Sequence, residues 1–404
     1  MTGRRTPLIE ALARALPYVL GAVALGGGCT WGSDPLPSDI EACARDQHPR
    51  AGDVGIDAEG RFTLDREPFV PRGIGSYPLL EHAGNGRLDA VGDILAQAVA
   101  LGRPVVRTNA FLDGTRNPAR IREADGTIRE EGLVGLDDLL AAAASFGVRL
   151  VLVLTDNWGH YGGAPAVVEM VAPGEGLPKD AFWSEPRAVA AQRAYVRRLA
   201  RRVSTVDGLA YASHPSILAW ELVNEARCTD DYWCDGGTLV RWARTMAGAM
   251  HDAGASQPIA WGGAGHLGEH GEDLEAIARD GAVDVLTLHV WPFAGHALHV
   301  DGRSASERVA VGVTFGADAI RSRAELARRH RMPLLVEELG WRPASGADRD
   351  AERALVLGAW LRAAREEGVG ALPWMIGEHD RPDYDGLLIR PWADPATHGA
   401  LRCE

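Results

Sequence analysis

Short apolar runs alternate with longer amphipathic stretches from residue 70 to the C-terminus. Runs rich in Val, Ile and Leu, with no polar alternation, are typical of strands buried on both faces of a parallel sheet. They predict eight strands, at 70–74, 104–108, 149–154, 217–223, 259–262, 285–290, 334–337 and 370–375. Apolar positions at helical spacing predict helices between them, at 88–101, 136–146, 187–206, 239–253, 304–329 and 348–367.

Strands that alternate with helices in this way predict an α/β fold, a closed (β/α)8 TIM barrel in a single domain. An open doubly wound sheet is the alternative, but no G-x-G-x-x-G motif follows the first predicted strand. Residues 61–69 predict a small hairpin that plugs the bottom of the barrel. We therefore assign 61–404 to the barrel domain, and 30–60, rich in Pro, Asp and Gly, to a linker and lead-in.

The first 29 residues have the pattern of an export segment. Arg4, Arg5 and Arg14 precede an apolar stretch at 16–25, which is too short to span a bilayer. Three glycines then lead to Cys29, which predicts a lipoprotein site and an extracellular or cell-envelope location. A plain cleaved signal and an amphipathic helix packed on the domain are the alternatives.

Composition narrows the classes of partner. A hydrophobic content of 46% is enough for a sizeable core, and the formal net charge of -13 disfavours nucleic acid or an anionic membrane surface. Lys179 is the only lysine among 42 basic residues, and we find no arginine cluster that would grip phosphate. We expect a monomer that does not bind nucleic acid and touches a membrane only through a lipid on Cys29.

The other cysteines suit an oxidising compartment. Cys228 and Cys234 lie six positions apart, whereas Cys43 and Cys403 flank the predicted barrel. One disulfide within the loop and one between the ends of the chain would be natural, although the connectivity stays open and buried thiols are the alternative. The spacing matches no zinc site, and the acidic stretch 378–385 lacks the pattern of a calcium loop. We expect no metal.

Two of the predicted strands end in a dipeptide that contains glutamate. The fourth ends in Asn224-Glu225 and the seventh in Glu337-Glu338. Residues at the carboxyl ends of barrel strands carry the chemistry of this fold, and two opposed carboxylates are what glycoside hydrolysis requires. We predict Glu225 as acid/base and Glu338 as nucleophile, because the period of two turns Glu337 to the other side.

Other strand ends supply supporting groups. Arg107 would hold Glu338 ionised by charge and hydrogen bonding, unless it forms an ordinary salt bridge. Asn224 would donate to a sugar 2-hydroxyl, and His289 and Trp291, two apart, point to one side. Trp374 would form a flat apolar floor for a pyranose ring.

Aromatic residues are frequent in loops on the same side. Trp158, Trp183, Trp233 and Trp341 follow predicted strands, and the long loop 156–185 is rich in Gly, Pro and Trp. Stacking on successive sugars would explain exposed loop aromatics, although we expect about half of them to pack the loops down instead.

These motifs resemble glycoside hydrolase family 5, a family of clan A retaining glycosidases, and within it the endo-β-1,4-mannanases. The stretch AWELVNEARC is similar to the mannanase motif around the acid/base, VVRTNAF to its arginine strand and PLLVEELG to its nucleophile strand. DNWGHYGG and DRPDYDG resemble its loops. The similarity runs in the same order from about residue 69 to residue 389.

The resemblance implies cleavage of β-1,4-mannosidic linkages in polysaccharides or oligosaccharides, without a cofactor. It implies Glu225 and Glu338 as catalytic residues and Arg227 as a contact on the leaving-group side. Three positions depart from the family: Ala226 replaces a proline, Trp291 a tyrosine that bonds the nucleophile, and Asn109 a tryptophan. Alternatives are a relative that cuts β-glucan or glucomannan, an exo-acting β-mannosidase, and a glycan-binding surface lipoprotein without activity.

Overall fold

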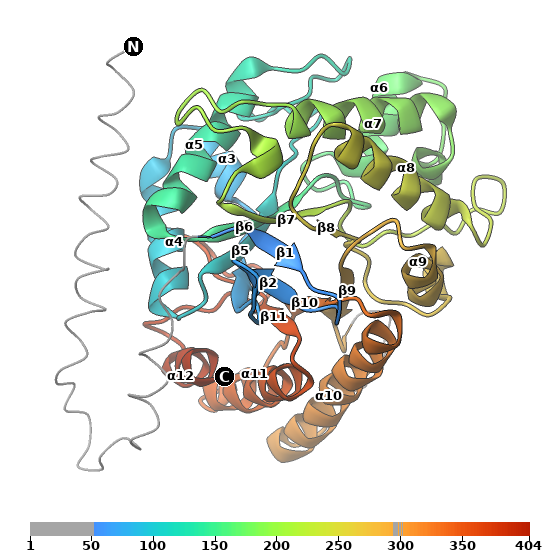
Figure 1. The fold of residues 1–404 in the computed structure, drawn as a ribbon. Helices are drawn as coiled ribbons and strands as arrows, with labels where there is room; N and C mark the ends of the chain where they lie inside the picture. The colour runs from blue at the N-terminus through green and yellow to red at the C-terminus, as the bar shows by residue number, and fades with distance from the viewer. Residues whose placement is uncertain (1–51, 294–297, 299, 301) are drawn as a thin grey trace.

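Eight parallel strands form a closed barrel (Figure 1). The computed structural model describes residues 52–293, 298, 300 and 302–404. Hydrogen bonding follows chain order through β4–β8 and through β9–β11, and parallel bridges from Ala260 to Val285 and from Arg72 to Ala371 join the two sets. The barrel strands are β4 (Gly73–Gly75), β5 (Val105–Asn109), β6 (Arg149–Val153), β7 (Ile217–Glu221), β8 (Ile259–Ala260), β9 (Leu286–Val290), β10 (Leu334–Leu339) and β11 (Gly370–Pro373). All eight predicted strands and the barrel are confirmed.

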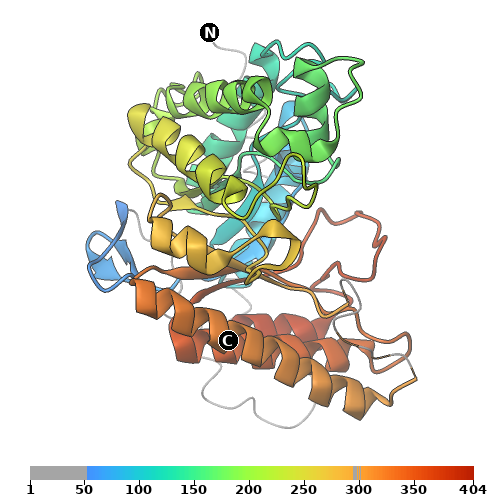
Figure 2. The same ribbon diagram turned by 90° about the vertical axis from the view of Figure 1, so that its right-hand side faces the viewer.

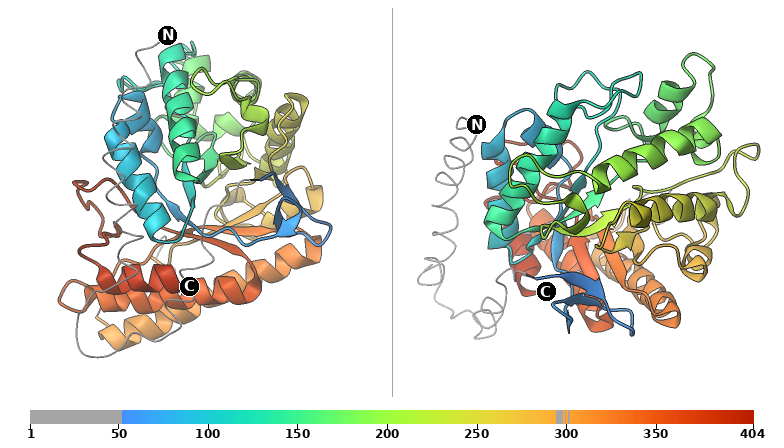
Figure 3. Two further views of the ribbon diagram at one scale, coloured as in Figure 1. Left: turned by 60° about the vertical axis from the view of Figure 1, so that its left-hand side comes forward. Right: turned by 45° about the horizontal axis from the view of Figure 1, so that its top comes forward.

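Helices surround the strands, and each predicted helix is present with altered ends. They are α3 (Leu79–Gly84), α4 (Leu88–Ala100), α5 (Glu130–Phe146), α6 (Gly163–Val171), α7 (Pro186–Ala200), α8 (Thr238–Asp252), α9 (Leu274–Asp280), α10 (Ala305–His330), α11 (Arg349–Glu367) and α12 (Pro395–Cys403), with 3-10 turns η1 (Lys179–Trp183), η2 (Tyr211–Ser213) and η3 (Glu269–Gly271). The long loop after β6 therefore carries a helix, α6. Figure 3 shows α10 and α11 side by side along one flank of the barrel.

Helix boundaries follow local chemistry. A capping box between Ser304 and Glu307 begins α10, and Pro186 occupies the first turn of α7. Gly147 and Gly368 end α5 and α11 in the left-handed conformation, which costs glycine no steric clash. Every helix in the described ranges is too short or too polar to cross a bilayer.

A small sheet closes the amino end of the barrel. The predicted hairpin is present as β2 (Phe62–Leu64) and β3 (Glu67–Pro68), and β1 (Val54–Ile56) adds a third strand from the segment predicted as linker. Phe62 packs into an apolar cluster with strand residues such as Val105 and Leu335. In Figure 2 this sheet lies at one end of the barrel, and the loop that follows β11 lies at the other. Ordered structure thus begins before residue 61, whereas the predicted export segment and Cys29 lie outside the described residues.

Candidate active site

A cleft of about 820 Å³ opens at the carboxyl ends of the barrel strands. Most of the predicted site residues meet there, although they are separated by up to 267 positions in the chain, from Arg107 to Trp374. The lining residues are Tyr77, Arg107, Thr108, Asn109, Val153, Asp156, Trp158, His160, Tyr161, Asn224, Glu225, Arg227, Trp291, Glu338, Trp374, Asp385 and Leu387. Parallel strands make this convergence possible, because all their carboxyl ends face the same way.

Glu225 and Glu338 face each other across this mouth. One carboxylate oxygen of each lies, with a ring nitrogen of His289, in a group whose atoms are all within 4.8 Å of one another. Glu225 has a backbone φ of 51°, a conformation uncommon for a residue with a side chain, which marks a locally enforced position. This spacing suits direct attack by one carboxylate, for which the carboxyls stand about 5–5.5 Å apart.

Arg107 organises the buried side of the cleft. Its Nη1 donates to Glu338 at 2.7 Å and its Nη2 to Asn224 Oδ1 at 2.8 Å. Its Nε and Nη2 donate to the two oxygens of Glu221, at 2.7 and 2.6 Å. Sequence reasoning missed Glu221, which is fully buried within an apolar strand. A lone acid in such a run is itself a signal, because a buried charge requires a partner.

The observed position of the Glu337 side chain contradicts the prediction that it turns away from Glu338. The pairing register shifts between Val336 and Glu338, so the simple alternation fails there. Glu337 Oε2 lies 3.6 Å from His289 Nε2 and 3.9 Å from Arg107 Nε, at the same cluster as Glu338. A bulge of this kind re-aims side chains, and bulges are common next to active sites.

His289 lies among three carboxyl groups. Its Nδ1 is 3.1 Å from Glu225 Oε1 and 3.5 Å from Glu338 Oε2, and its Nε2 faces Glu337. Burial opposes its charged form, but the charge of Glu338 and the hydrogen bond with Glu225 raise the pKa of His289 to about 10. Burial likewise opposes ionisation of Glu225, yet His289 and Trp158 lower the pKa of Glu225 to about 2. The resident proton of this pair therefore lies on the imidazole.

Indole and amide groups fix the carboxylates. Trp291 Nε1 donates to Glu338 Oε2 at 2.6 Å, and Trp158 Nε1 donates to Glu225 Oε2 at 2.7 Å. His289 and Trp291 do point to one side, as predicted. Asn224 Nδ2 donates to Asp156 Oδ1 at 3.0 Å, so one of its two amide protons is engaged. Burial raises the pKa of Asp156 to about 7.

The aromatic rings of Trp374 and Tyr77 form another wall of the cleft. Trp374 lies against Tyr77, with ring centroids 5.8 Å apart and planes inclined by 17°. Both rings line the cleft, and the ring of Trp291 lies edge-on to Trp374, with centroids 6.2 Å apart. Arg227 lies with its guanidinium carbon 4.9 Å from the centre of the Trp158 ring. Tyr77 was not predicted, because it follows the short strand β4 without a motif of its own.

The other three loop tryptophans pack against the core of the protein. Trp183 is buried against Trp242, with ring centroids 5.0 Å apart, and Trp341 is buried and donates to Glu352 at 2.9 Å. Neighbouring helices cover both rings, so these two belong to the half that was expected to pack the loops down and do not stack on sugars. Trp233 packs beside the core and lines no part of the cleft, which leaves Trp158 as the loop tryptophan at the site.

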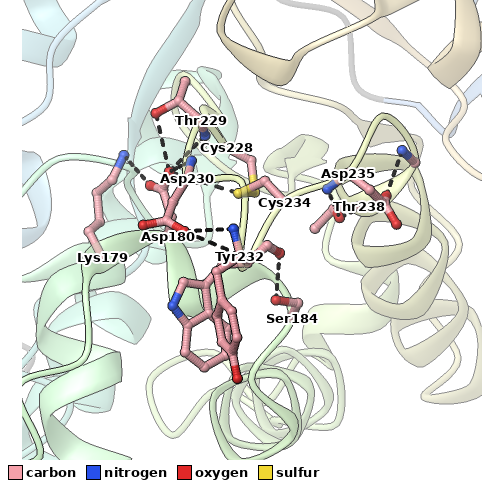
Figure 4. Close-up of a disulfide and its surroundings, with 12 residues drawn as sticks. Lys179, Asp180, Ser184, Cys228, Thr229, Asp230, Tyr232, Cys234, Asp235 and Thr238 are labelled. Atoms are coloured by element: carbon pink, nitrogen blue, oxygen red, sulfur yellow. Dashed lines mark hydrogen bonds and ion pairs between the residues drawn. A yellow bond between two sulfur atoms is a disulfide. The ribbon is translucent and has the colours of Figure 1, made fainter.

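A disulfide joins Cys228 to Cys234 in the loop that follows Glu225 and Arg227, as predicted (Figure 4). Beneath it, Asp180 accepts hydrogen bonds from the backbone N–H groups of Thr229 and Asp230, at 2.7 and 3.0 Å. The loop is thereby fixed to the end of the β6–α7 connection. The other predicted pair cannot be followed, because Cys43 lies outside the described residues.

The donor set does not favour a metal at this site. Glu225, His289 and Glu338 present three atoms at compatible distances. However, the two oxygens of Glu338 already accept from Arg107 and Trp291. A guanidinium 2.7 Å from the carboxylate also opposes a second cation.

Residues 95–355 match the family described as GH family 5 beta-mannosidase-like. The chain is 30% identical over 368 residues to mannan endo-1,4-beta-mannosidase 2 of Oryza sativa subsp. japonica, which covers 83% of this chain and 80% of that protein. It is 29% identical over 373 residues to mannan endo-1,4-beta-mannosidase 1 of the same organism, covering 86% and 84%. The solved endo-1,4-beta-D-mannanase of Thermotoga petrophila RKU-1 is similar with a TM-score of 0.70 and 26% identity, over 83% of this chain and 98% of that one. The chain is therefore a glycosidase that belongs to glycoside hydrolase family 5, in its β-mannosidase-like branch.

Proposed function

We propose that this protein is a retaining endo-β-mannanase, which cleaves β-1,4-mannosidic linkages within mannan-type polysaccharides by double displacement. The observation that carries the proposal is the opposition of Glu225 and Glu338 across the cleft, within one 4.8 Å cluster. The names of the relatives, mannan endo-1,4-beta-mannosidases, support this choice of linkage.

In the first step a Glu338 oxygen attacks the anomeric carbon, while Glu225 protonates the departing glycosidic oxygen. Arg107 and Trp291 orient Glu338 by their hydrogen bonds. Glu225 needs a proton for this step, and His289 holds it 3.1 Å away. A sugar that displaces water from the cleft favours the neutral pair over the charged one, which moves the proton from His289 to Glu225.

In the second step Glu225 removes a proton from water, which attacks the anomeric carbon of the glycosyl ester and releases Glu338. Configuration is retained because each step inverts it once. Asn224 keeps one amide proton for the sugar 2-hydroxyl, and the ring of Trp374, which lines the cleft, would pack against the sugar ring. Arg227 lines the cleft beside Trp158, which supports its proposed contact with the leaving-group side.

Product sizing tests the proposal. We expect galactomannan and linear mannan to release internal fragments of several sizes, and cellulose to release little. Mannose as the only product would indicate an exo-acting β-mannosidase, and preferred cleavage of cellulose or glucomannan would indicate a different β-glycan. No reducing ends from any of these glycans would leave a binding protein without activity.

Substitution tests the two roles. Glu225→Gln and Glu338→Gln should each lower kcat by about 10²–10⁴-fold or more, with melting temperatures close to that of the parent. Glu269→Gln, in which the carboxylate is 64% exposed, is the matched control and should retain activity. Activity close to the parent in either cleft variant would contradict the assignment.

Export belongs to the same proposal. The basic and apolar pattern of residues 1–29 supports secretion, with a lipid on Cys29. Incorporation of labelled palmitate, abolished by Cys29→Ala, tests the anchor, and secretion without label would leave plain export.

A further inference from the structure

Helix α7 carries a basic stripe on the outside of the barrel. Residues 197–202 read RRLARR, and Arg193 precedes them by one helical turn. A groove of about 770 Å³ lies along this helix, and it shares no residue with the catalytic cleft. Its lining residues are Glu130, Ala190, Arg193, Ala194, Arg197, Arg198, Arg201, Arg202, Val203 and Thr205.

Three of these arginines lie in one row along the helix. Arg193, Arg197 and Arg201 are spaced by four residues, which places successive positions about 6 Å apart on the same face. Like charges at this spacing destabilise a helix. Among the described residues, none of the three forms an ion pair, whereas Arg202 is bound by Asp137 at 2.6 Å. Repulsion along the row is opposed by the favourable placement of basic side chains at the C-terminal end of the helix, and no ion pair within the described residues neutralises the charge of the row.

The proposed reaction does not explain this row. Mannan is uncharged, and the groove lies apart from the cleft. The positive charge of this row is also opposite in sign to the formal net charge of the whole chain, which is -13. A concentration of positive charge on an acidic protein attracts an anionic ligand to that place.

The uncharged residues that line the groove indicate which class of anionic ligand fits it. Ala190, Ala194 and Val203 leave apolar surface between the arginines, which suits the C–H faces of sugar rings. A second cavity of about 450 Å³ is lined in part by the same two residues, Ala194 and Arg198. A guanidinium binds carboxylate through two parallel hydrogen bonds. Clusters rich in Lys or Arg are also typical of sites for acidic glycans.

We propose that the α7 groove binds a linear acidic polysaccharide, with its carboxylates on Arg193, Arg197 and Arg201 and its sugar faces on the alanines between them. This site would hold the enzyme on a matrix that contains acidic glycan, while the cleft remains free for its neutral substrate. The binding is independent of the proposed mannanase activity.

The test is affinity electrophoresis and calorimetry of the full chain with polygalacturonate, at low and at physiological ionic strength. In the variant Arg193→Gln/Arg197→Gln/Arg201→Gln we expect affinity to fall about tenfold or more, because three charge contacts are lost. Activity on soluble mannan and the melting temperature should be unchanged, since all three side chains lie outside the cleft. Binding by the parent should also weaken as salt increases.

The matched control changes three exposed arginines on α9 and α10, Arg279→Gln/Arg321→Gln/Arg329→Gln, for the same change in net charge. It should bind polygalacturonate as the parent does. Equal losses in the two triple variants would overturn the proposal, because net charge alone would then account for binding. No binding by the parent at low salt would also overturn it, as would tighter binding to polyphosphate or DNA than to polygalacturonate.

Discussion

Two buried glutamates on either side of Arg107 should respond in opposite ways to the same substitution. Glu221 and Glu337 are both fully buried, and glutamine has nearly the shape of glutamate. Glu221 accepts two hydrogen bonds from Arg107, at 2.7 and 2.6 Å. Among the described residues, neither oxygen of Glu337 has a hydrogen-bond partner. We therefore expect Glu221→Gln to destabilise the protein at every pH, and Glu337→Gln to stabilise it once Glu337 would be ionised.

The magnitude follows from the pKa of Glu337. Burial, together with the charge of Glu221, raises the pKa of Glu337 from 4.5 to about 7 in the folded protein. The folded chain therefore keeps a proton that the unfolded chain releases between these two values. Stability from this group is complete below pH 4.5, declines as pH rises and is lost above pH 7. The loss amounts to about 3 kcal/mol, because each pKa unit corresponds to about 1.4 kcal/mol.

Guanidinium denaturation at about pH 5 and about pH 8.5 measures both effects. At the lower pH, Glu337→Gln should leave the free energy of unfolding within about 1 kcal/mol of the parent. At the higher pH the variant should be more stable, relative to the parent, by up to about 3 kcal/mol. Glu221→Gln should lose about 3–5 kcal/mol at both, because it breaks a buried ion pair. A difference for Glu337→Gln that does not change with pH, or a loss as large as that of Glu221→Gln, would refute the reasoning.

Three further outcomes are expected. Trp291→Phe removes the N–H donor to Glu338, so kcat on mannan should fall about 10–100-fold with little change in melting temperature; an unchanged kcat would show that the bond does not assist the reaction. Cys228→Ser/Cys234→Ser opens a short loop, and calorimetry should report a loss of about 2 kcal/mol, which reduction of the parent should reproduce. Trp374→Ala should lower kcat/KM about tenfold by removing a sugar-facing wall, whereas Trp392→Ala, at a ring 50% exposed and outside the cleft, should leave it unchanged. Equal effects of these two would argue against a sugar contact at Trp374.

Much of this protein is determined by its sequence. The eight strands were predicted within a few residues, because strands buried on both faces leave continuous apolar runs that helices do not imitate at this length. Glu225 and Glu338 could be identified because each follows an apolar run at its carboxyl end. Polar side chains at that end of a barrel strand lie at the mouth of the barrel. Trp291 departs from the family's tyrosine, and its indole N–H nevertheless donates to the second of these acids.

Only the tertiary structure decided where other side chains point. A register shift on β10 turned Glu337 to His289, and local periodicity contains no sign of such a shift. Trp183 and Trp341 are buried because helices distant in the chain cover them, and exposure depends on such neighbours rather than on a residue's own position. The partners of Arg107 and the groove along α7 arise in the same way. Alternation and spacing are local properties that the chain carries by itself, whereas burial, ion pairing and cavities are properties of segments that meet only when the barrel closes.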